Sequence, residues 1–128
     1  MSPGLALLFW SLVLFETKHF VCDFVLQTQY QKQNKERYGH PGGLIHAGLQ
    51  GVGSLPAIVL LTHSVLLIAG IVVAEFVVHY HIDWLKERIV KNRRWNTEIR
   101  GFWQVFGADQ MLHNFTYVGI IGVLWPGT

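Results

Sequence analysis

The sequence predicts an all-α membrane protein in which four helices cross the bilayer as one bundle. Its 128 residues are 51% hydrophobic, and the mean hydropathy is +0.31. Apolar stretches fill nearly the whole chain, and each reaches the roughly 20 residues that a helix needs to span a bilayer. Long runs within them are apolar on every face, which is typical of helices that contact lipid. We expect a single transmembrane domain over residues 1–128, with spans at about 5–27, 44–62, 65–83 and 102–125.

The first two spans have recognisable boundaries. Pro3 opens the span at 5–27, and because no basic residue precedes its apolar run, we interpret it as a retained helix and not as a signal peptide. The polar segment 28–43 follows and ends in a Pro-Gly-Gly sequence that predicts a break. The span at 44–62 contains Pro56, which predicts a kink.

The third span continues beyond the predicted membrane as a basic extension to about Arg94. A second polar loop, 96–101, leads into the fourth span. Tryptophan is enriched at membrane–water interfaces, and Trp95, Trp103 and Trp125 are spaced to suit such positions.

The basic residues predict how the bundle is oriented. Lys18 lies near the inner end of the first span, and the two long loops with their flanking helix ends contain Lys32, Lys35, Arg37, Lys86, Arg88, Lys91, Arg93, Arg94 and Arg100. Loops rich in lysine and arginine stay cytoplasmic. We therefore expect a multi-pass protein of a cytoplasmic membrane, with both long loops inside and both termini outside.

Ionisable residues recur at a spacing of four within the spans, which places them on one face of each helix. Such residues are costly in a membrane, and their default interpretation is functional. In the expected orientation they all reach one layer near the cytoplasmic interface, where imidazole and carboxylate would suit zinc or another divalent metal. The candidate ligands, enough for one or two ions, are His19, Asp23, His46, His79, Asp83, Asp109 and His113.

These residues favour a metal-dependent hydrolase at the cytoplasmic leaflet, acting on a phospholipid or another lipid-linked phosphate. The metal would activate water and offset the charge of the phosphoryl group. The candidate catalytic residues are Asp83, His113 and Glu75, the last as a general base or as support for a ligand. Candidate substrate-binding residues are Gln27, Lys86 and Gln110. We interpret His40, His63 and His81 as solvated.

Other functions stay open. A hydrogen-bonded polar core without metal, a metal or proton conduit, and an accessory subunit of a membrane complex are the alternatives. The outer halves of the spans have no ionisable residue, which argues against a channel within one protomer, although a homo-oligomer could supply one. The basic residues are interpreted as topology signals and not as a nucleic-acid site. The single cysteine, Cys22, excludes an internal disulfide framework.

Four polar segments resemble the family called domain of unknown function 3307, which consists of small bacterial and phage integral-membrane proteins. The segments are H-x3-D-F-x-x-Q from His19, the histidine that opens the second span, H-x3-D-x-x-K from His79, and D-Q-x-x-H from Asp109. The resemblance covers nearly the whole chain. It implies a four-span protein of the bacterial inner membrane with these polar positions, and it implies no particular activity. The H-x3-D spacing is also similar to that of membrane-bound metal-dependent hydrolases.

The predicted orientation can be tested by labelling single cysteines with a membrane-impermeant thiol reagent. In a Cys22→Ser background, cysteines at Gln33 and Asn96 should react only after the cells are permeabilised. Cysteines at Ser2 and Thr128 should react in intact cells. Labelling of either loop position in intact cells would contradict both the topology and the depth inferred for the polar layer.

Overall fold

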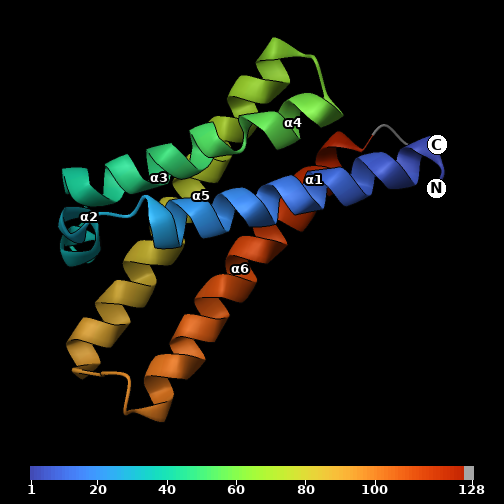
Figure 1. The fold of residues 1–128 in the computed structure, drawn as a ribbon. Helices are drawn as coiled ribbons and strands as arrows, with labels where there is room; N and C mark the ends of the chain where they lie inside the picture. Colours follow the sequence, from blue (N-terminus) through green and yellow to red (C-terminus); the bar gives the residue numbers. More distant parts are fainter. Residues whose placement is uncertain (126–128) are drawn as a thin grey trace.

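A computed structural model describes residues 1–125 and folds them into helices joined by short connections (Figure 1). The described part of the chain has no β-strand, so the prediction of an all-α fold is confirmed. In chain order the elements are α1 (Pro3–Phe20), the π-helix η1 (Val21–Val25), α2 (Gln29–Asn34), α3 (Pro41–Gly53), α4 (Leu55–Leu61), α5 (Val65–Arg93) and α6 (Arg100–Leu124).

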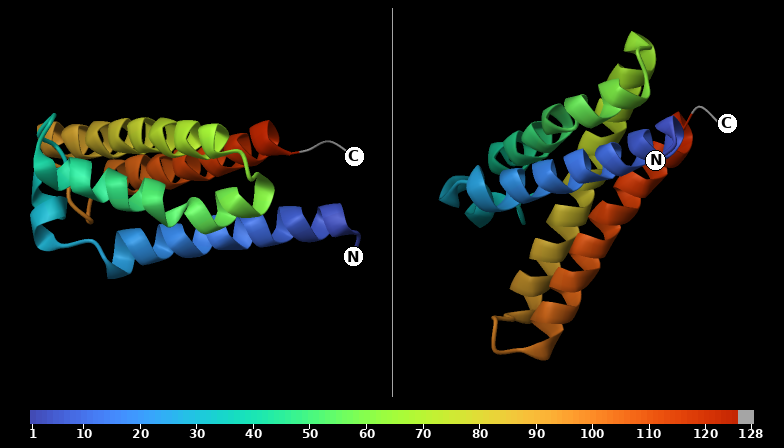
Figure 2. Two further views of the ribbon diagram at one scale, coloured as in Figure 1. Left: turned by 90° about the horizontal axis from the view of Figure 1, so that it is seen from above. Right: turned by 45° about the vertical axis from the view of Figure 1, so that its right-hand side comes forward.

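The helices form two antiparallel pairs that cross obliquely (Figure 2). One pair consists of α1 and the α3–α4 segment, and the other of α5 and α6. Both long connections lie at one end of the molecule, whereas the start of α1, the turn before α5 and the end of α6 lie at the other (Figure 2). At that second end Gly4 packs against the ring of Trp125.

Three helical segments are long and apolar enough to cross a membrane, which indicates that the protein is membrane-associated. They are Pro3–Val25, Pro41–Leu61 and Val65–Arg93. Helix α6 has 25 residues but is not among them. The reason lies in its composition, because Asp109, Gln110, His113 and Asn114 lower the hydropathy of its middle.

The first two predicted spans differ from the observed helices in detail. The first ends at Val25 as a π-helix, two residues before the predicted Gln27. The second begins earlier than expected, at Pro41, and His40 caps it by accepting a hydrogen bond from the Gly42 amide at 3.1 Å. The predicted kink is present as a break at Ser54, directly before the segment that contains Pro56.

The third helix continues to Arg93 as one unbroken element, which confirms the predicted extension past residue 83. Arg94 ends it with φ 54°, a left-handed conformation common at helix C-termini. The fourth helix starts at Arg100, two residues before the predicted boundary.

The polar segment 28–43 is not the plain loop that we expected. It contains α2, whose start is fixed by a capping box in which Thr28 and Gln31 hydrogen-bond each other's backbone amides. Behind α2, Lys35 and Glu36 are buried, and Glu36 forms an ion pair with Lys91 of α5. So short a helix has too few residues to show periodicity, and its stability comes from the cap and from tertiary contacts.

Helix α3 approaches the neighbouring helices closely because it contains several glycines. A Cβ atom on Gly51 would lie 3.2 Å from the Val72 carbonyl oxygen of α5, and one on Gly43 would lie 3.2 Å from the Tyr80 ring. Small residues allow such close packing between helices in membranes. The polar side chains of α3 are thereby brought into reach of those on α5.

The apolar core occupies the half of the bundle that contains the start of α1 and the end of α6. Its centre is the stack of Phe15 on Tyr117, with ring centroids 5.1 Å apart and an interplanar angle of 9°. The other buried members are Ala57, Ile58, Ile120, Ile121 and Leu124. The described residues of this half thus separate the polar layer from the far end of the bundle.

Replacing Phe15 by alanine should reduce the free energy of unfolding by about 3 kcal/mol, because it leaves a cavity against Tyr117 and Ile58. The measurement is reversible unfolding in mixed micelles. Phe9→Ala is the matched control, since Phe9 is on the same helix and 49% exposed. Equal effects of the two substitutions would contradict the assigned core.

Candidate metal centre

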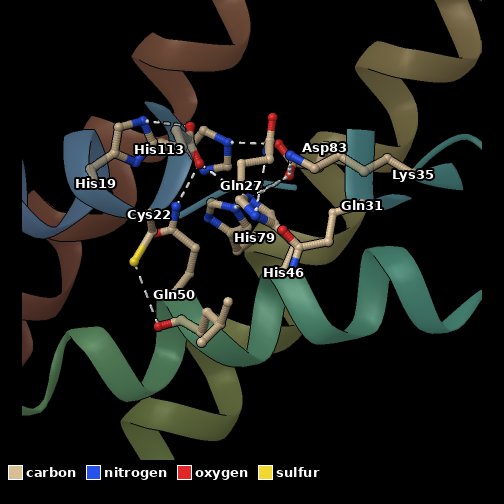
Figure 3. Close-up of polar contacts among 12 residues, drawn as sticks. His19, Cys22, Gln27, Gln31, Lys35, His46, Gln50, His79, Asp83 and His113 are labelled. Atoms are coloured by element: carbon tan, nitrogen blue, oxygen red, sulfur yellow. Dashed lines mark hydrogen bonds and ion pairs between the residues drawn. The ribbon is translucent and has the colours of Figure 1, made fainter. Parts of the chain in front are cut away.

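The carboxylate of Asp83, on α5, is the meeting point of the polar layer (Figure 3). Its Oδ2 atom lies 2.7 Å from Lys35 Nζ, 3.2 Å from His46 Nε2 and 3.4 Å from His79 Nε2. Its Oδ1 atom lies 3.3 Å from His113 Nε2. These partners come from the end of α2, from α3, from α5 itself and from α6, so one carboxylate connects four helical elements.

Three of these atoms form a nearly equilateral triangle. The Nε2 atoms of His46 and His79 are 3.2 Å apart, and Asp83 Oδ2 is 3.2 and 3.4 Å from them. Ligands bound tetrahedrally to zinc at its usual bond lengths are about 3.3 Å from one another. The triangle therefore has the dimensions of three corners of a zinc coordination shell.

Asp23 extends the triangle from η1. Its Oδ1 atom lies 3.0 Å from His46 Nε2. The residues of the layer that offer metal-ligand atoms within 4.8 Å of one another form two groups, Asp23–His46–His79 and His79–Asp83–His113. Because the groups share His79, they describe one compact centre of five residues.

Hydrogen bonding alone explains this arrangement poorly. The Nε2 atoms of His46 and His79 face each other, and a neutral imidazole has only one N–H. A hydrogen bond between them therefore requires one ring to carry its proton on Nε2 and the other ring to carry its proton on Nδ1. The Nδ1 atom of His79 is buried and has no hydrogen-bond partner in the described chain. If it carries the proton, the Nε2 lone pair of His79 is directed into the centre.

The charges of the layer also favour a cation. Three carboxylates, Asp23, Asp83 and Asp109, lie around the histidines, and within residues 1–125 Lys35 is the one ammonium paired with them. With neutral histidines the sum is three negative charges and one positive, or −2. One divalent ion would neutralise that charge.

His19 lies at the edge of the centre and outside both ligand groups. Its Nδ1 atom is 2.6 Å from the Tyr117 hydroxyl, and its Nε2 atom is 3.1 Å from Gln110 Oε1 and 3.2 Å from Asp23 Oδ2. Both ring nitrogens thus have protein partners. His19, a predicted ligand, therefore lies next to Asp23 but is not one of the five residues of the centre.

Asp109 has a comparable position beside His113. Its Oδ1 atom lies 3.4 Å from His113 Nε2, and its Oδ2 atom accepts a hydrogen bond from Gln110 at 3.0 Å. Residues in such positions fix the orientation of metal ligands. Of the seven predicted ligands, five form the centre, and His19 and Asp109 adjoin it.

A polar cavity of about 300 Å³ opens beside the centre and is lined by Asp23, Asp83 and Asp109. All three predicted substrate-binding residues, Gln27, Lys86 and Gln110, line it, and so do Lys32 and Lys35. Gln27 also approaches the centre directly, with Nε2 3.4 Å from His46 Nδ1. The apolar part of the wall consists of Phe24, Val90, Phe102 and Phe106.

Glu75 is not where a base at the centre would be. It is 1% exposed, and its Oε1 atom pairs with Lys18 and accepts a hydrogen bond from Ser54 at 2.8 Å. Lys18 was expected at the membrane surface and is instead buried, together with Glu75, between α1 and α5. A spacing rule within one helix does not reveal such a pair, since its members are far apart in sequence.

Lys35 is another residue that the sequence assigned only to topology. It ends α2 and is buried against Asp83. The signal for this position was the capping box at Thr28, which starts a helix that directs Lys35 back toward the bundle. His81, by contrast, is exposed as expected, and its ring contacts the Tyr38 hydroxyl at 2.9 Å.

A known protein family matches most of the chain. Residues 11–127 match the family described as "Protein of unknown function (DUF3307)". The chain belongs to this family. The matched range contains every residue of the centre and of the cavity, so these features lie within the DUF3307 domain. No curated protein and no solved structure matches the chain significantly.

Proposed function

We propose that the protein is a zinc-dependent hydrolase that cleaves a phosphate ester of a lipid or lipid-linked molecule at the cytoplasmic leaflet of a bacterial inner membrane. The observation that carries the proposal is a cavity that opens directly onto the cluster of histidines and aspartates and has three lysines in its wall beside the carboxylates, with Lys86 paired to Glu87 at 2.6 Å. A cavity of this kind suits an anionic group that must reach a metal. The apolar part of its wall suits the lipid portion of such a substrate.

In our proposal α6 is the fourth membrane span, and the chain has both termini outside. The polar side chains of α6 that lower its hydropathy include Asp109 and His113, which are 4% and 1% exposed. Most of its exposed large side chains are apolar, namely Trp103, Met111, Leu112, Phe115, Val118 and Val123, and the polar exceptions are Arg100, Gln104 and Asn114. The helix would therefore present a mainly apolar surface to lipid while its ionisable side chains face the bundle.

The proposed zinc ligands are Asp23, His46, His79 and Asp83. His46, His79 and Asp83 have the spacing of three corners of a zinc shell, Asp23 Oδ1 lies 3.0 Å from His46 Nε2, and the net charge of the layer matches one divalent ion. Water would take a fifth position on the cavity side, since zinc at catalytic sites can expand to five ligands. The ion would lower the pKa of that water and polarise the phosphoryl group.

The chain's own residues would supply the remaining steps. Lys32, Lys35 and Lys86 would bind the phosphate oxygens, and Gln27 and Gln110 would orient the ester. The water oxygen bonds to phosphorus, one of its protons passes to a carboxylate of the site, and the bond from phosphorus to the ester oxygen breaks. His113, held between Asp83 and Asp109, would relay that proton from the carboxylate to the leaving oxygen.

An apolar groove between α5 and α6 supports a lipid as the substrate. It has a volume of about 290 Å³ and is lined by side chains such as Ile82, Leu85 and Leu112. Lys86 and Asp109 line both this groove and the polar cavity. An acyl chain in the groove would thus lie next to a head group in the cavity.

A second candidate is an accessory subunit of a membrane complex, in which a bound ion would have a structural role. A membrane protein that handles metal ions or protons is the other form of this alternative. Glu16 favours a partner chain, because its carboxylate is exposed within the first apolar segment. A charge facing lipid is costly. A second copy of the chain or another membrane protein would remove that cost by covering this face.

Protein purified without chelator should contain about one zinc ion per chain. His46→Ala and His79→Ala should abolish this content, because each removes one corner of the ligand triangle. Elemental analysis of the detergent-solubilised protein is the measurement. His81→Ala is the matched control, since His81 lies two residues from His79 on the same helix and is exposed. Wild-type protein without divalent metal would refute the proposal.

Hydrolysis of phosphate esters in mixed lipid vesicles should depend on the cavity residues in two different ways. Lys86→Ala should raise KM about tenfold, because it removes one charged hydrogen bond to the substrate. His113→Ala should lower kcat about 100-fold, which is typical for loss of a general acid. Steady-state kinetics with zinc content measured in parallel separates the effects. Zinc-loaded wild type that turns over no lipid phosphate would leave the structural role as the better explanation.

A further inference from the structure

A second buried polar cluster lies beside the metal centre. It consists of the ion pair between Lys18 of α1 and Glu75 of α5, which are 8% and 1% exposed, with Ser54 bound to the same carboxylate oxygen. A buried ion pair seldom stabilises a fold more than apolar side chains of similar size would. Its contacts with neighbouring residues are therefore more informative than its strength.

Lys18 also fixes the side-chain amide of Gln50. Its ammonium group donates hydrogen bonds to Gln50 Oε1 at 2.9 Å and to the Gln50 carbonyl oxygen at 3.3 Å. An ammonium group can only donate, so the amide oxygen must face Lys18. The amide nitrogen must then point to the opposite side.

That nitrogen points to a proposed metal ligand. Gln50 Nε2 donates a hydrogen bond to Asp23 Oδ1 at 2.6 Å. The same oxygen lies 3.0 Å from His46 Nε2, whereas Asp23 Oδ2 lies 3.2 Å from His19. Each oxygen of the Asp23 carboxylate thus has its own partners. The hydrogen bond from Gln50 holds the carboxylate in the orientation that places Oδ1 next to His46.

We propose that Lys18 and Glu75 form a positioning unit for the metal centre, which acts through Gln50 to hold Asp23 in its ligating orientation. Glu75 holds Lys18, Lys18 orients the amide, and the amide orients the carboxylate. This inference rests on the proposed metal binding and not on the proposed hydrolysis. It also corresponds to the second of the two roles expected for Glu75, support for a ligand.

The test is the zinc affinity of purified full-length variants, measured by competition with a chromogenic chelator. Lys18→Met/Glu75→Leu replaces the ion pair with apolar side chains, and Gln50→Leu removes the amide while leaving the pair intact. Each should weaken zinc binding about 10- to 100-fold, the usual effect of losing a group that orients a ligand. The visible spectrum of the Co²⁺-loaded protein should change in both, because it reports the geometry of the ligands.

Combining the substitutions gives the decisive measurement. If the pair acts through Gln50, the triple variant should bind zinc no more weakly than Gln50→Leu alone, since the effects are not additive along one chain of contacts. Ser11→Ala is the control, because Ser11 is a buried polar residue of α1 whose hydroxyl donates to the Leu7 carbonyl of its own helix.

Three outcomes would overturn the inference. A folded double variant with wild-type zinc affinity and Co²⁺ spectrum would make the pair purely structural. Fully additive losses would show that the pair and Gln50 act separately. If the double variant does not fold, unchanged affinity in Gln50→Leu alone would still refute the route. Wild type that binds no zinc would refute the proposed function as well, whereas intact wild-type binding with unaffected variants would refute only this inference.

Discussion

The convergence of buried charge on Asp83 is the constraint on which the rest of the structure depends. A carboxylate that is 4% exposed needs opposite charge or hydrogen bonds nearby, because an isolated buried charge is very costly. Here the partners come from four helical elements and not from one neighbour. The position of α2 follows from this requirement, because α2 places Lys35 next to Asp83. The close approach of α3 to α5, made possible by Gly51 and Gly43, has the same effect for His46.

The two halves of the bundle have different tasks. Around Phe15 and Tyr117 the helices are held by apolar packing, whereas around Asp83 they are held by ion pairs and imidazole contacts. Tyr117 belongs to both halves, because its ring packs in the core while its hydroxyl contacts His19. Lys18 also lies at this boundary, with its ammonium group 4.5 Å from the centroid of the Tyr117 ring. The polar layer is thereby connected to the apolar core.

Much of the candidate site was predictable because helical periodicity converts a spacing of four into a shared face. That rule correctly brought together His79 with Asp83, and Asp109 with His113, and it separated the exposed His81. The end of α5 near Arg94 also followed from local signals, whereas the start of α3 at Pro41 came three residues before the predicted boundary. The family resemblance inferred from these motifs is confirmed by the match over residues 11–127.

Contacts between distant segments were not predictable in the same way. Lys18 and Lys35 look like ordinary cationic residues at a membrane surface, and only the tertiary structure pairs them with Glu75 and Asp83. Likewise, Glu75 stands one turn from His79 and shares its helical face, yet its carboxylate is directed to Lys18. Periodicity specifies the face of one helix, but the partner on that face depends on how the helices cross.

The low hydropathy of α6 has a consequence for how the molecule is made. In the proposed topology α6 leaves the ribosome after α1 and α5, and its Asp109, Gln110 and His113 would meet lipid if it entered the membrane alone. Their partners, His19 on α1 and Asp83 on α5, are synthesised earlier. Helices α1 and α5 would thus provide the polar partners that allow α6 to enter the membrane. The polar side chains of the site would then come together only after α6 has been synthesised. A nascent chain that stalled before α6 would expose an incomplete cleft, rich in carboxylates, to the quality-control machinery of the membrane.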